Sequence, residues 1–444
     1  MSRISRKHHF ATDDDLNALE WRLFLTLVFV GGWVLIQKIP MIADRLTPPV
    51  VVFGYILLVA GLVWVLLQPS SFKAFSKWTR IIRVVPWLFM VVALACGVQL
   101  AQYSFALSAR PVSDSAEALV CIGRDIVSGH DPYVVRLFRC DQQVPLNQLD
   151  LPTPLDLSIY SHARGYPSVA LQKQVLSGAY GQRVLNRVYP PLAYPPLGAL
   201  WLLPVLGLPF HWVGVWLTLL VFLWMLLMGR EAGRAWPFAV AALGVQVLFN
   251  TVSFMAVMGN AEVVPYALAT LSLALVRHPK RSAALLGLAV ASNQIIWLLV
   301  LPYLPFTRRL PGFGSRLGWL VGTAALATLP WLIFYPNMLH ALLSVFTMPD
   351  FNSGAGLTGI FGAGNLPQTV KIYFTGAMIL AYFVWAWMAY RSPKWALCFV
   401  PLATAVTWLG WRGDSNYLYL VLPLTVGMII GISRLDPEQV ATSD

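Results

Sequence analysis

Long apolar segments recur from one end of the chain to the other, and each has roughly the length that an α-helix needs to cross about 30 Å of hydrocarbon. Inside a bilayer the backbone must satisfy its own hydrogen bonds, so helices are the expected spanning elements. With 58% hydrophobic and 11% charged residues, the composition excludes an ordinary soluble domain. We therefore predict an all-α polytopic membrane protein with about 10–13 transmembrane helices. The predicted spans are 22–37, 50–67, 84–107, 212–228, 237–257, 263–276, 317–335, 372–390, 395–411 and 416–432.

The net charge of +12 at pH 7 is distributed in a way that predicts topology. Of the 31 Lys and Arg residues, 19 fall in the two ends of the chain and in short segments that alternate between the spans. Such loops stay in the cytoplasm, so the other connections are expected outside the cell membrane. The predicted cytoplasmic segments are 68–83, 229–236, 277–282, 308–316 and 391–395, and the extracytoplasmic ones are 108–189, 258–262, 336–368 and 412–415. The basic residues are not interleaved with aromatics, and no nucleic-acid partner is expected.

These assignments divide the chain into four parts. They are an N-terminal arm with three transmembrane helices (1–107), an extracytoplasmic loop with amphipathic helices (108–189), a helix bundle with broken helices and an outer loop at 336–368 (190–432), and a cytoplasmic tail (433–444).

Two apolar segments, 194–208 and 283–306, disturb the alternation of loops if both cross the membrane fully. We predict that both are hairpins or broken half-helices, because Pro204 and Pro209 interrupt the first and "SNQ" at 292–294 interrupts the second. The alternative is that both cross the bilayer and the positive-inside rule is locally violated.

The long outer loop contains an amphipathic pattern over residues 114–127. It predicts a helix on the outer surface of the membrane domain, capped by Ser113 and ended by Gly129, after which "HDPY" turns the chain. The apolar face consists of Ala116, Leu119, Val120, Ile122, Ile126 and Val127. Cys121 and Cys140 lie in the same loop, where they either form a disulfide or remain two buried thiols.

Several motifs follow one another in a distinctive order. Asp114 precedes "SGHDPY" (128–133), "YPPLAYPPLGALWLLP" (189–204), "MGNAEVVPYALATLSLAL" (258–275) and "KRSAALLGLAVASNQIIWLLVLPYL" (280–304). Over roughly residues 108–310 this order resembles the glycosyltransferases of the GT-C fold that use polyprenyl-phosphate sugars, most closely the mannosyltransferase-like glycosyltransferase family 87. The family's Gly-Gln-x-Asn turn reads Gly259-Asn260-Ala261-Glu262 here, and the lysine of its later helix is replaced around Asn293 and Gln294.

The resemblance implies a GT-C-like bundle that transfers one sugar, mannose-like or a pentose, from polyprenyl phosphate to a lipid or glycan acceptor, with inversion. An acceptor hydroxyl needs a general base, which contributes about 10²- to 10⁴-fold to the rate. Asp114 is the candidate base, followed by Glu117 and Asp125. The alternative for Asp114 is an acid that stabilises a helix N-terminus by less than about 1 kcal/mol.

The leaving lipid phosphate requires cations or N–H donors. Arg183, Arg187 and Arg412 are candidates for this role, and the alternative for each is anchoring at the membrane interface. Further candidates for contact with donor or acceptor are Asp131, Tyr133, Tyr189, Tyr194, Asn260, Glu262, Asn293, Gln294 and His340.

The two Tyr-Pro-Pro triplets predict an extended, rigid segment, because proline keeps the preceding residue out of the α region. Such a segment, with Tyr189 and Tyr194 at the interface, is suited to border a slot for a lipid-linked donor. The alternative is an ordinary helix N-terminus with interfacial tyrosines.

The expected partners are a polyprenyl-phosphate-linked sugar donor, a lipid or glycan acceptor and membrane lipids. No cofactor is expected, and no spacing of residues predicts a metal site. A transporter or flippase of a lipid-linked precursor is one alternative, disfavoured because the polar residues inside the spans, such as Gln99 and Asn250, are uncharged. A ligase or polymerase that moves a whole lipid-linked glycan is the other.

Overall fold

The computed structural model describes residues 13–38, 48–67, 82–88, 91, 114–134, 170, 192, 194–209, 211–249, 261–347, 353–354, 357, 370–407, 409, 412–413 and 421–435. For Asp114, Glu117 and Arg412 it describes the backbone alone.

The described part of the chain is helical apart from one pair of two-residue strands, which confirms the predicted all-α class. The α-helices are α1 (Asp13–Lys38), α3 (Pro48–Leu67), α5 (Asp114–Val127), α8 (Pro196–Leu200), α9 (His211–Ala232), α10 (Trp236–Phe249), α12 (Val263–Ala274), α13 (Pro279–Ser292), α14 (Trp297–Arg308), α15 (Phe313–Phe334), α16 (Met338–Thr347), α17 (Lys371–Arg391), α18 (Pro393–Leu397), α19 (Phe399–Thr407) and α21 (Val421–Ile432). The 3₁₀ turns are η2 (Pro132–Val134), η4 (Leu203–Val205), η5 (Gly233–Ala235) and η6 (Gln294–Ile296). The strands β1 (Ser353–Gly354) and β2 (Arg412–Gly413) pair in parallel.

Three stretches of the described chain are long and apolar enough to cross a membrane: His211–Gly244, Phe313–Phe334 and Lys371–Arg391. The first of them contains a turn, and its part before the turn, α9, has 22 residues. Two other predicted spans contain shorter helices than a full crossing requires. The segment 263–276 contains α12, which has 12 residues, and 395–411 divides at Cys398 into parts of α18 and α19. Twelve helical residues reach about 18 Å, which is too short for a full crossing. A hydropathy pattern cannot locate these helix ends, because the residues at which the helices stop, such as Leu275 and Cys398, are themselves apolar.

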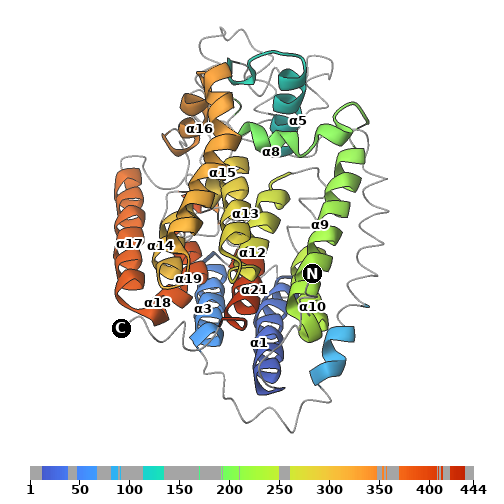
Figure 1. Cartoon of the computed structure of the whole chain (residues 1–444), viewed down its shortest axis with the longest axis vertical. Coiled ribbons are helices and arrows are strands. Elements are labelled where there is room, and N and C mark those ends of the chain that lie inside the picture. Colours follow the sequence, from blue (N-terminus) through green and yellow to red (C-terminus); the bar gives the residue numbers. More distant parts are fainter. Residues whose placement is uncertain are drawn as a thin grey trace, which may run out of the picture.

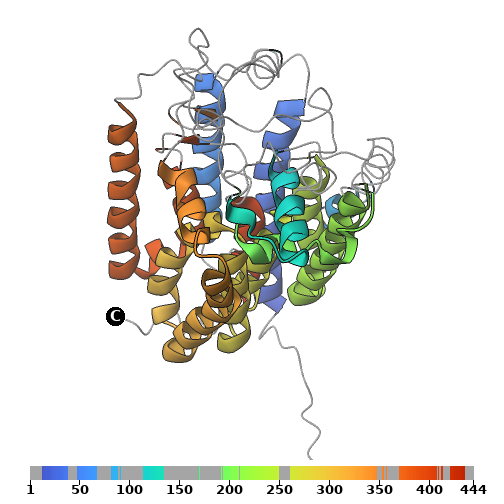
Figure 2. The ribbon, with the colours of Figure 1, turned by 90° about the horizontal axis from the view of Figure 1, so that it is seen from above.

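The helices form a bundle in which α9 and α17 lie at opposite sides in both views (Figures 1 and 2). The chain turns back between α9 and α10 at η5, where Gly233 adopts a φ of 62°. The two helices approach closely, since a Cβ at Gly229 would lie 3.1 Å from Val240 Cγ2. α21 packs as closely against α12, because a Cβ at Gly427 would lie 2.4 Å from the Thr270 carbonyl oxygen.

The apolar segment after residue 279 is broken, as the sequence predicts. α13 ends at Ser292, Asn293 is extended (φ −155°, ψ 132°), and α14 runs back. Its return is shown by the 3.0 Å contact between the hydroxyls of Ser282 and Tyr303. A Cβ at Gly312, which precedes α15, would lie only 3.3 Å from Pro279 Cγ. The two halves therefore form a hairpin whose ends meet at one end of the bundle.

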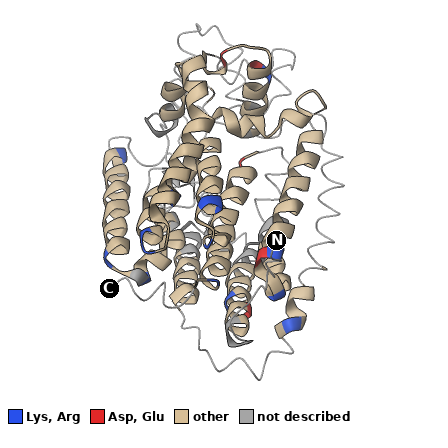
Figure 3. Ribbon diagram, viewed as in Figure 1, with Lys and Arg blue, Asp and Glu red and all other residues tan. Residues whose placement is uncertain are grey.

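The connections between helices gather at two ends of the bundle. We call one of them the basic end; it holds the turns before α10, α13, α15 and α18. Two of these turns are linked there, because Arg309 Nη1 donates to the carbonyl oxygen of Ala389 near the end of α17 (2.8 Å). The other, the site end, holds α5, α8 and the turn between α15 and α16. These groups match the two predicted sets of loops, and the assignment of the basic end to the cytoplasm stays a prediction. Charged residues are sparse along the long helices (Figure 3).

Candidate active site

Helix α5 lies at the site end, next to α8 and close to α16 in Figure 1. Ala116, Leu119, Val120 and Ile122 are buried, as the amphipathic pattern predicts. Val127 is 66% exposed, contrary to the prediction. The reason is its place in the last turn, where the chain leaves the helix and the 3.6-residue pattern no longer decides burial.

The turn after α5 follows the predicted course. Gly129 adopts a φ of 74°, which favours glycine. His130 N–H then donates to the Asp125 carbonyl oxygen (2.8 Å). Asp131 Oδ1 accepts from the N–H of Tyr133 (2.9 Å), so the aspartate stabilises its own turn.

Tyr133 connects this turn to the Tyr-Pro-Pro segment and to α15. Its hydroxyl donates to the carbonyl oxygen of Tyr194 (2.8 Å). Its ring lies 6.1 Å from that of Tyr335, which in turn stacks on Trp331 at 6.0 Å and an interplanar angle of 9°. Asn337 Nδ2 lies 3.4 Å from Asp131 Oδ2. The sequence motif "SGHDPY" is thus anchored on both sides by the bundle.

The second Tyr-Pro-Pro triplet adopts the predicted extended conformation. Pro195 has φ −60° and ψ 144°, and α8 begins only at Pro196. The segment 194–208 then forms α8 and η4 rather than a spanning helix, in agreement with the predicted interruption. The first triplet, with Tyr189, lies outside the described residues.

Gly198 permits an unusually close contact at the centre of the site end. A Cβ at this position would lie 2.5 Å from the carbonyl oxygen of Ser292 and 3.4 Å from Leu119 Cδ2. Trp201 Nε1 also donates to Ser292 Oγ (3.0 Å). Helix α8 is therefore held between α5 and the broken end of α13. Leu119 lies five residues from Asp114, or about 8 Å along the axis of α5.

Glu262 lies at the same level as the break in α13. Ser272 Oγ donates to the Ser282 carbonyl oxygen (2.7 Å) near the turn between α12 and α13. Glu262 is ten residues before Ser272 and Ser292 is ten residues after Ser282, so both lie about 15 Å from this contact. α12 also contacts η6, which begins with Gln294. The exposed fractions of Glu262, Asn293 and Gln294 are only 8%, 2% and 5%.

Asn293 has a structural function that the sequence did not reveal. Its Oδ1 accepts from the N–H of Ile295 (2.8 Å), which caps η6 and fixes the break. Trp297 Nε1 donates to the Val290 carbonyl oxygen (2.9 Å) across the same break. The predicted interruption at "SNQ" is therefore stabilised by its own side chains.

The acids of the turn have a distinctive electrostatic environment. Burial raises the pKa of the Asp125 carboxyl above its ordinary value, nearby His130 opposes this rise and Asp131 adds to it. Asp125 Oδ2 is buried and has no hydrogen-bond partner in the described part of the chain. Burial, Asp131 and Asp125 likewise raise the pKa of the Tyr335 phenol.

Of the other residues predicted for the site, the structure describes only some. Arg183, Arg187 and Asn260 lie outside the described residues. His340 is exposed on α16, and Arg412 is paired through its backbone with Ser353, which joins two loops predicted on the outer face. Cys121 is disulfide-bonded, while its expected partner Cys140 is not among the described residues. Within the described ranges, no three His, Cys, Asp or Glu side chains are placed to hold a metal ion.

Sequence analysis missed Tyr335, Trp331 and Gly198 as residues of this region. The motif "YPNMLH" drew attention to the outer loop, but nothing in it indicates that Tyr335 packs on Tyr133. Gly198 follows the second Tyr-Pro-Pro triplet, and its importance is visible only once Ser292 is placed against it.

The fold and this polar region define the class of the protein: an all-α protein with membrane-spanning helices and a layer of buried polar residues where broken helices meet. More specifically, residues 192–432 match the model of glycosyltransferase family 87, which is more than half of the 444-residue chain. The chain therefore belongs to this family, and it is a membrane glycosyltransferase. The match begins after α5, so it includes Glu262, Asn293 and Gln294 but not Asp114. No curated protein and no solved structure matches the chain.

Proposed function

We propose that the protein transfers one sugar, mannose-like or a pentose, from a polyprenyl-phosphate donor to a lipid or glycan acceptor on the extracytoplasmic face, with inversion. The observation that carries the proposal is the contact at Gly198, which packs the helix of Asp114 through α8 onto the break in α13. This contact joins α5 to the buried polar layer of the family-matched region.

In this proposal Asp114 takes the proton of the acceptor hydroxyl as that oxygen attacks the anomeric carbon. The bond from the anomeric carbon to the phosphate oxygen breaks, and the lipid phosphate leaves with the electron pair. Helix α5 supports this role because its buried face and the anchored turn that follows it hold the helix in place. A general base of this kind contributes about 10²- to 10⁴-fold.

Glu262 and Gln294 are the proposed contacts for sugar hydroxyls. Glu262 lies at the N-terminal end of α12 and Gln294 lies at the break after α13. Non-helical backbone at membrane depth is found next to protein or a water-filled cavity. Arg183, Arg187 and Arg412 are the proposed contacts for the lipid phosphate, which fits the preference of phosphates for guanidinium groups. The Tyr-Pro-Pro segment, rigid at Pro195, borders the route of the lipid.

Transfer is tested with purified protein and a radiolabelled polyprenyl-phosphate sugar. We expect label in a glycosidic product for wild type and a rate at least about 100-fold lower for Asp114→Asn, at unchanged melting temperature. Glu117→Gln, in the same helix, is the matched control and should retain most of the rate. If Glu117→Gln loses activity while Asp114→Asn keeps it, Asp114 is not the general base and Glu117 takes its place as the candidate. Movement of intact lipid without a new glycosidic bond would support the flippase alternative instead.

A further inference from the structure

Arg316 is a buried arginine at the basic end, in the first turn of α15, whereas Tyr335 of the site end follows the last turn of the same helix. Arg316 is the fourth residue of α15, one turn from the left-handed Gly312 that precedes the helix. Its exposed fraction is 2%, and it is the largest fully buried side chain among the residues that the structure describes. An arginine cannot lose its charge in a protein, so this position holds a permanent cation.

The guanidinium is only partly satisfied. Its Nε and Nη1 have no hydrogen-bond partner within the described residues. The polar group that acts on it is the hydroxyl of Tyr303, which is itself 3.0 Å from Ser282 Oγ. Neither hydroxyl carries a charge. A buried cation without an opposite charge is strongly destabilising.

Arg308 and Arg309, which come just before α15, have their own partners. Arg309 donates to the carbonyl oxygens of Ala389 and Tyr390, at 2.8 and 2.6 Å. The Arg308 guanidinium lies 4.5 Å from the centre of the Tyr390 ring. Arg316 therefore differs from these two arginines, because its buried Nε and Nη1 have no partner among the described residues.

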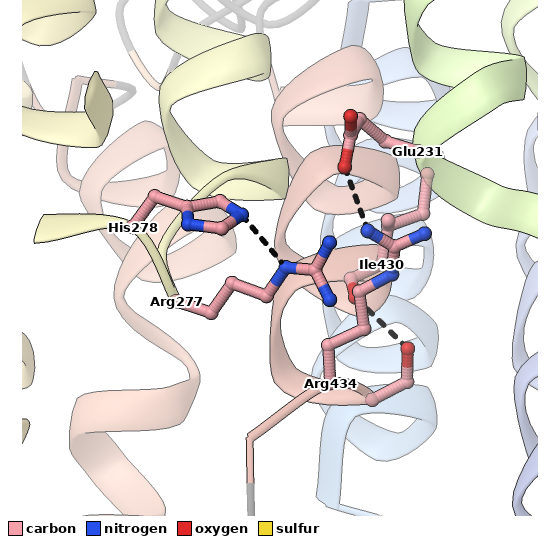
Figure 4. A network of polar contacts seen from close by, with 6 residues as sticks. Glu231, Arg277, His278, Ile430 and Arg434 are labelled. Atoms are coloured by element: carbon pink, nitrogen blue, oxygen red, sulfur yellow. Dashed lines mark hydrogen bonds and ion pairs between the residues drawn. The ribbon is translucent and has the colours of Figure 1, made fainter. Parts of the chain in front are cut away.

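Among the described residues, no acidic side chain at this end compensates for the charge of Arg316. Figure 4 shows Glu231 in an ion pair with Arg434 (2.6 Å), while Arg277 Nε donates to His278 Nε2 (3.0 Å). No acidic group contributes to the electrostatic environment of Arg316 in the described part of the chain. Lys280 and Arg281 are exposed nearby in sequence at the start of α13, so the surroundings are positive.

We propose that Arg316 is the anchor of a binding site for a phosphate oxyanion, supplied by the headgroup of an anionic phospholipid or by free phosphate. A phosphate oxygen accepts strong charge-assisted bonds from a guanidinium, and Nε and Nη1 each offer such a donor here. The N-terminus of α15 adds backbone N–H groups and a positive dipole. Arg316 is one helical turn, about 5 Å, from the end of α15, where basic residues meet the headgroups of a leaflet. The site is separate from the proposed active site and does not depend on the proposed function.

The test measures thermal unfolding of the purified full-length chain by tryptophan fluorescence, in neutral detergent with one addition at a time. The additions are phosphatidylglycerol, phosphatidylcholine with the same acyl chains, and inorganic phosphate. For wild type we expect saturating phosphatidylglycerol to raise the melting temperature by about 5 °C and phosphatidylcholine to have little effect. A comparable rise with inorganic phosphate alone would identify free phosphate as the source, whereas its absence identifies the lipid headgroup.

Arg316→Gln should lose most of this rise, while the matched control Arg281→Gln, which removes one exposed charge at the same end, should keep it. If Arg316→Gln does not fold, Arg316→Lys retains the charge but lacks the Nε and Nη1 donors of the guanidinium, and it should show a clearly smaller rise. An equal rise with phosphatidylcholine, no rise with either anion, or an undiminished rise in the Arg316 variants would each overturn the proposal.

Discussion

At the scale of single residues, the site end depends on hydrogen bonds from the turn that follows α5. Tyr133 is the clearest case, because its hydroxyl is buried and has one specific acceptor, the carbonyl oxygen of Tyr194. Asp125 is the opposite case, since one of its oxygens is buried without a partner in the described chain. We therefore expect substitutions of these two residues to have opposite effects on the free energy of unfolding.

Tyr133→Phe removes the hydroxyl and leaves the ring in place. We expect a loss of about 1 kcal/mol in the free energy of unfolding, because the carbonyl oxygen of Tyr194 loses its donor. Thermal unfolding measures this. Tyr373→Phe is the control, since Tyr373 is 73% exposed and the change should leave the melting temperature unchanged. Equal melting temperatures for wild type and Tyr133→Phe would show that the bond contributes nothing.

Asp125→Asn is expected to stabilise the protein near pH 7. The folded pKa of Asp125 is raised, so the folded state holds the proton more tightly than the unfolded state. This contribution is complete below the unfolded pKa and is lost as the pH rises through the folded pKa. Between about pH 4 and 7 the melting temperature should therefore decrease less with rising pH for the variant than for wild type. If Asp125 contacts the substrate, the same variant should also show a lower rate of sugar transfer. A melting temperature below that of wild type at pH 7 would contradict the predicted stabilisation.

At the scale of elements, short helices placed against a broken one build the site end. α8 has five residues and no side-chain cap, so it is not stable by itself. Its position comes from tertiary contacts with α5 and α13. Gly198 is where these contacts are closest.

Gly198→Ala tests this arrangement. The added Cβ would meet the carbonyl oxygen of Ser292, a backbone atom that cannot rotate away. We expect a loss of about 1–3 kcal/mol in stability and a marked fall in sugar transfer as α5 is displaced. Gly207→Ala is the control, because a Cβ there meets nothing within 4 Å. If both variants melt and turn over alike, the close contact has no functional importance.

At the scale of the whole molecule, the basic end joins elements that are far apart in the sequence. Arg434 follows α21, yet its Nη1 lies 2.6 Å from Glu231 Oε2 at the end of α9. The side chain of Arg434 is only 7% exposed and that of Glu231 is 20% exposed. This pair therefore joins two residues that are 203 positions apart in the chain.

Glu231→Gln should lower the free energy of unfolding by about 1.5–3 kcal/mol, because Arg434 stays buried without an opposite charge. Arg230→Gln, the neighbouring exposed cation, should have little effect on the melting temperature. Comparable melting temperatures for Glu231→Gln and wild type would mean that solvent replaces the carboxylate at this end.

Sequence determined the class, the interruption of the apolar segments near residues 204 and 293, and the end of α5 at its glycine. These features depend on local chemistry: apolar length, proline, an Asn cap and a positive φ at Gly129. The contact of Gly198 with Ser292, the packing of Tyr133 against Tyr335 and the burial of Arg316 without an opposite charge in the described part of the chain were decided by tertiary structure alone. Each depends on residues far apart in the chain, whose distances no local pattern encodes.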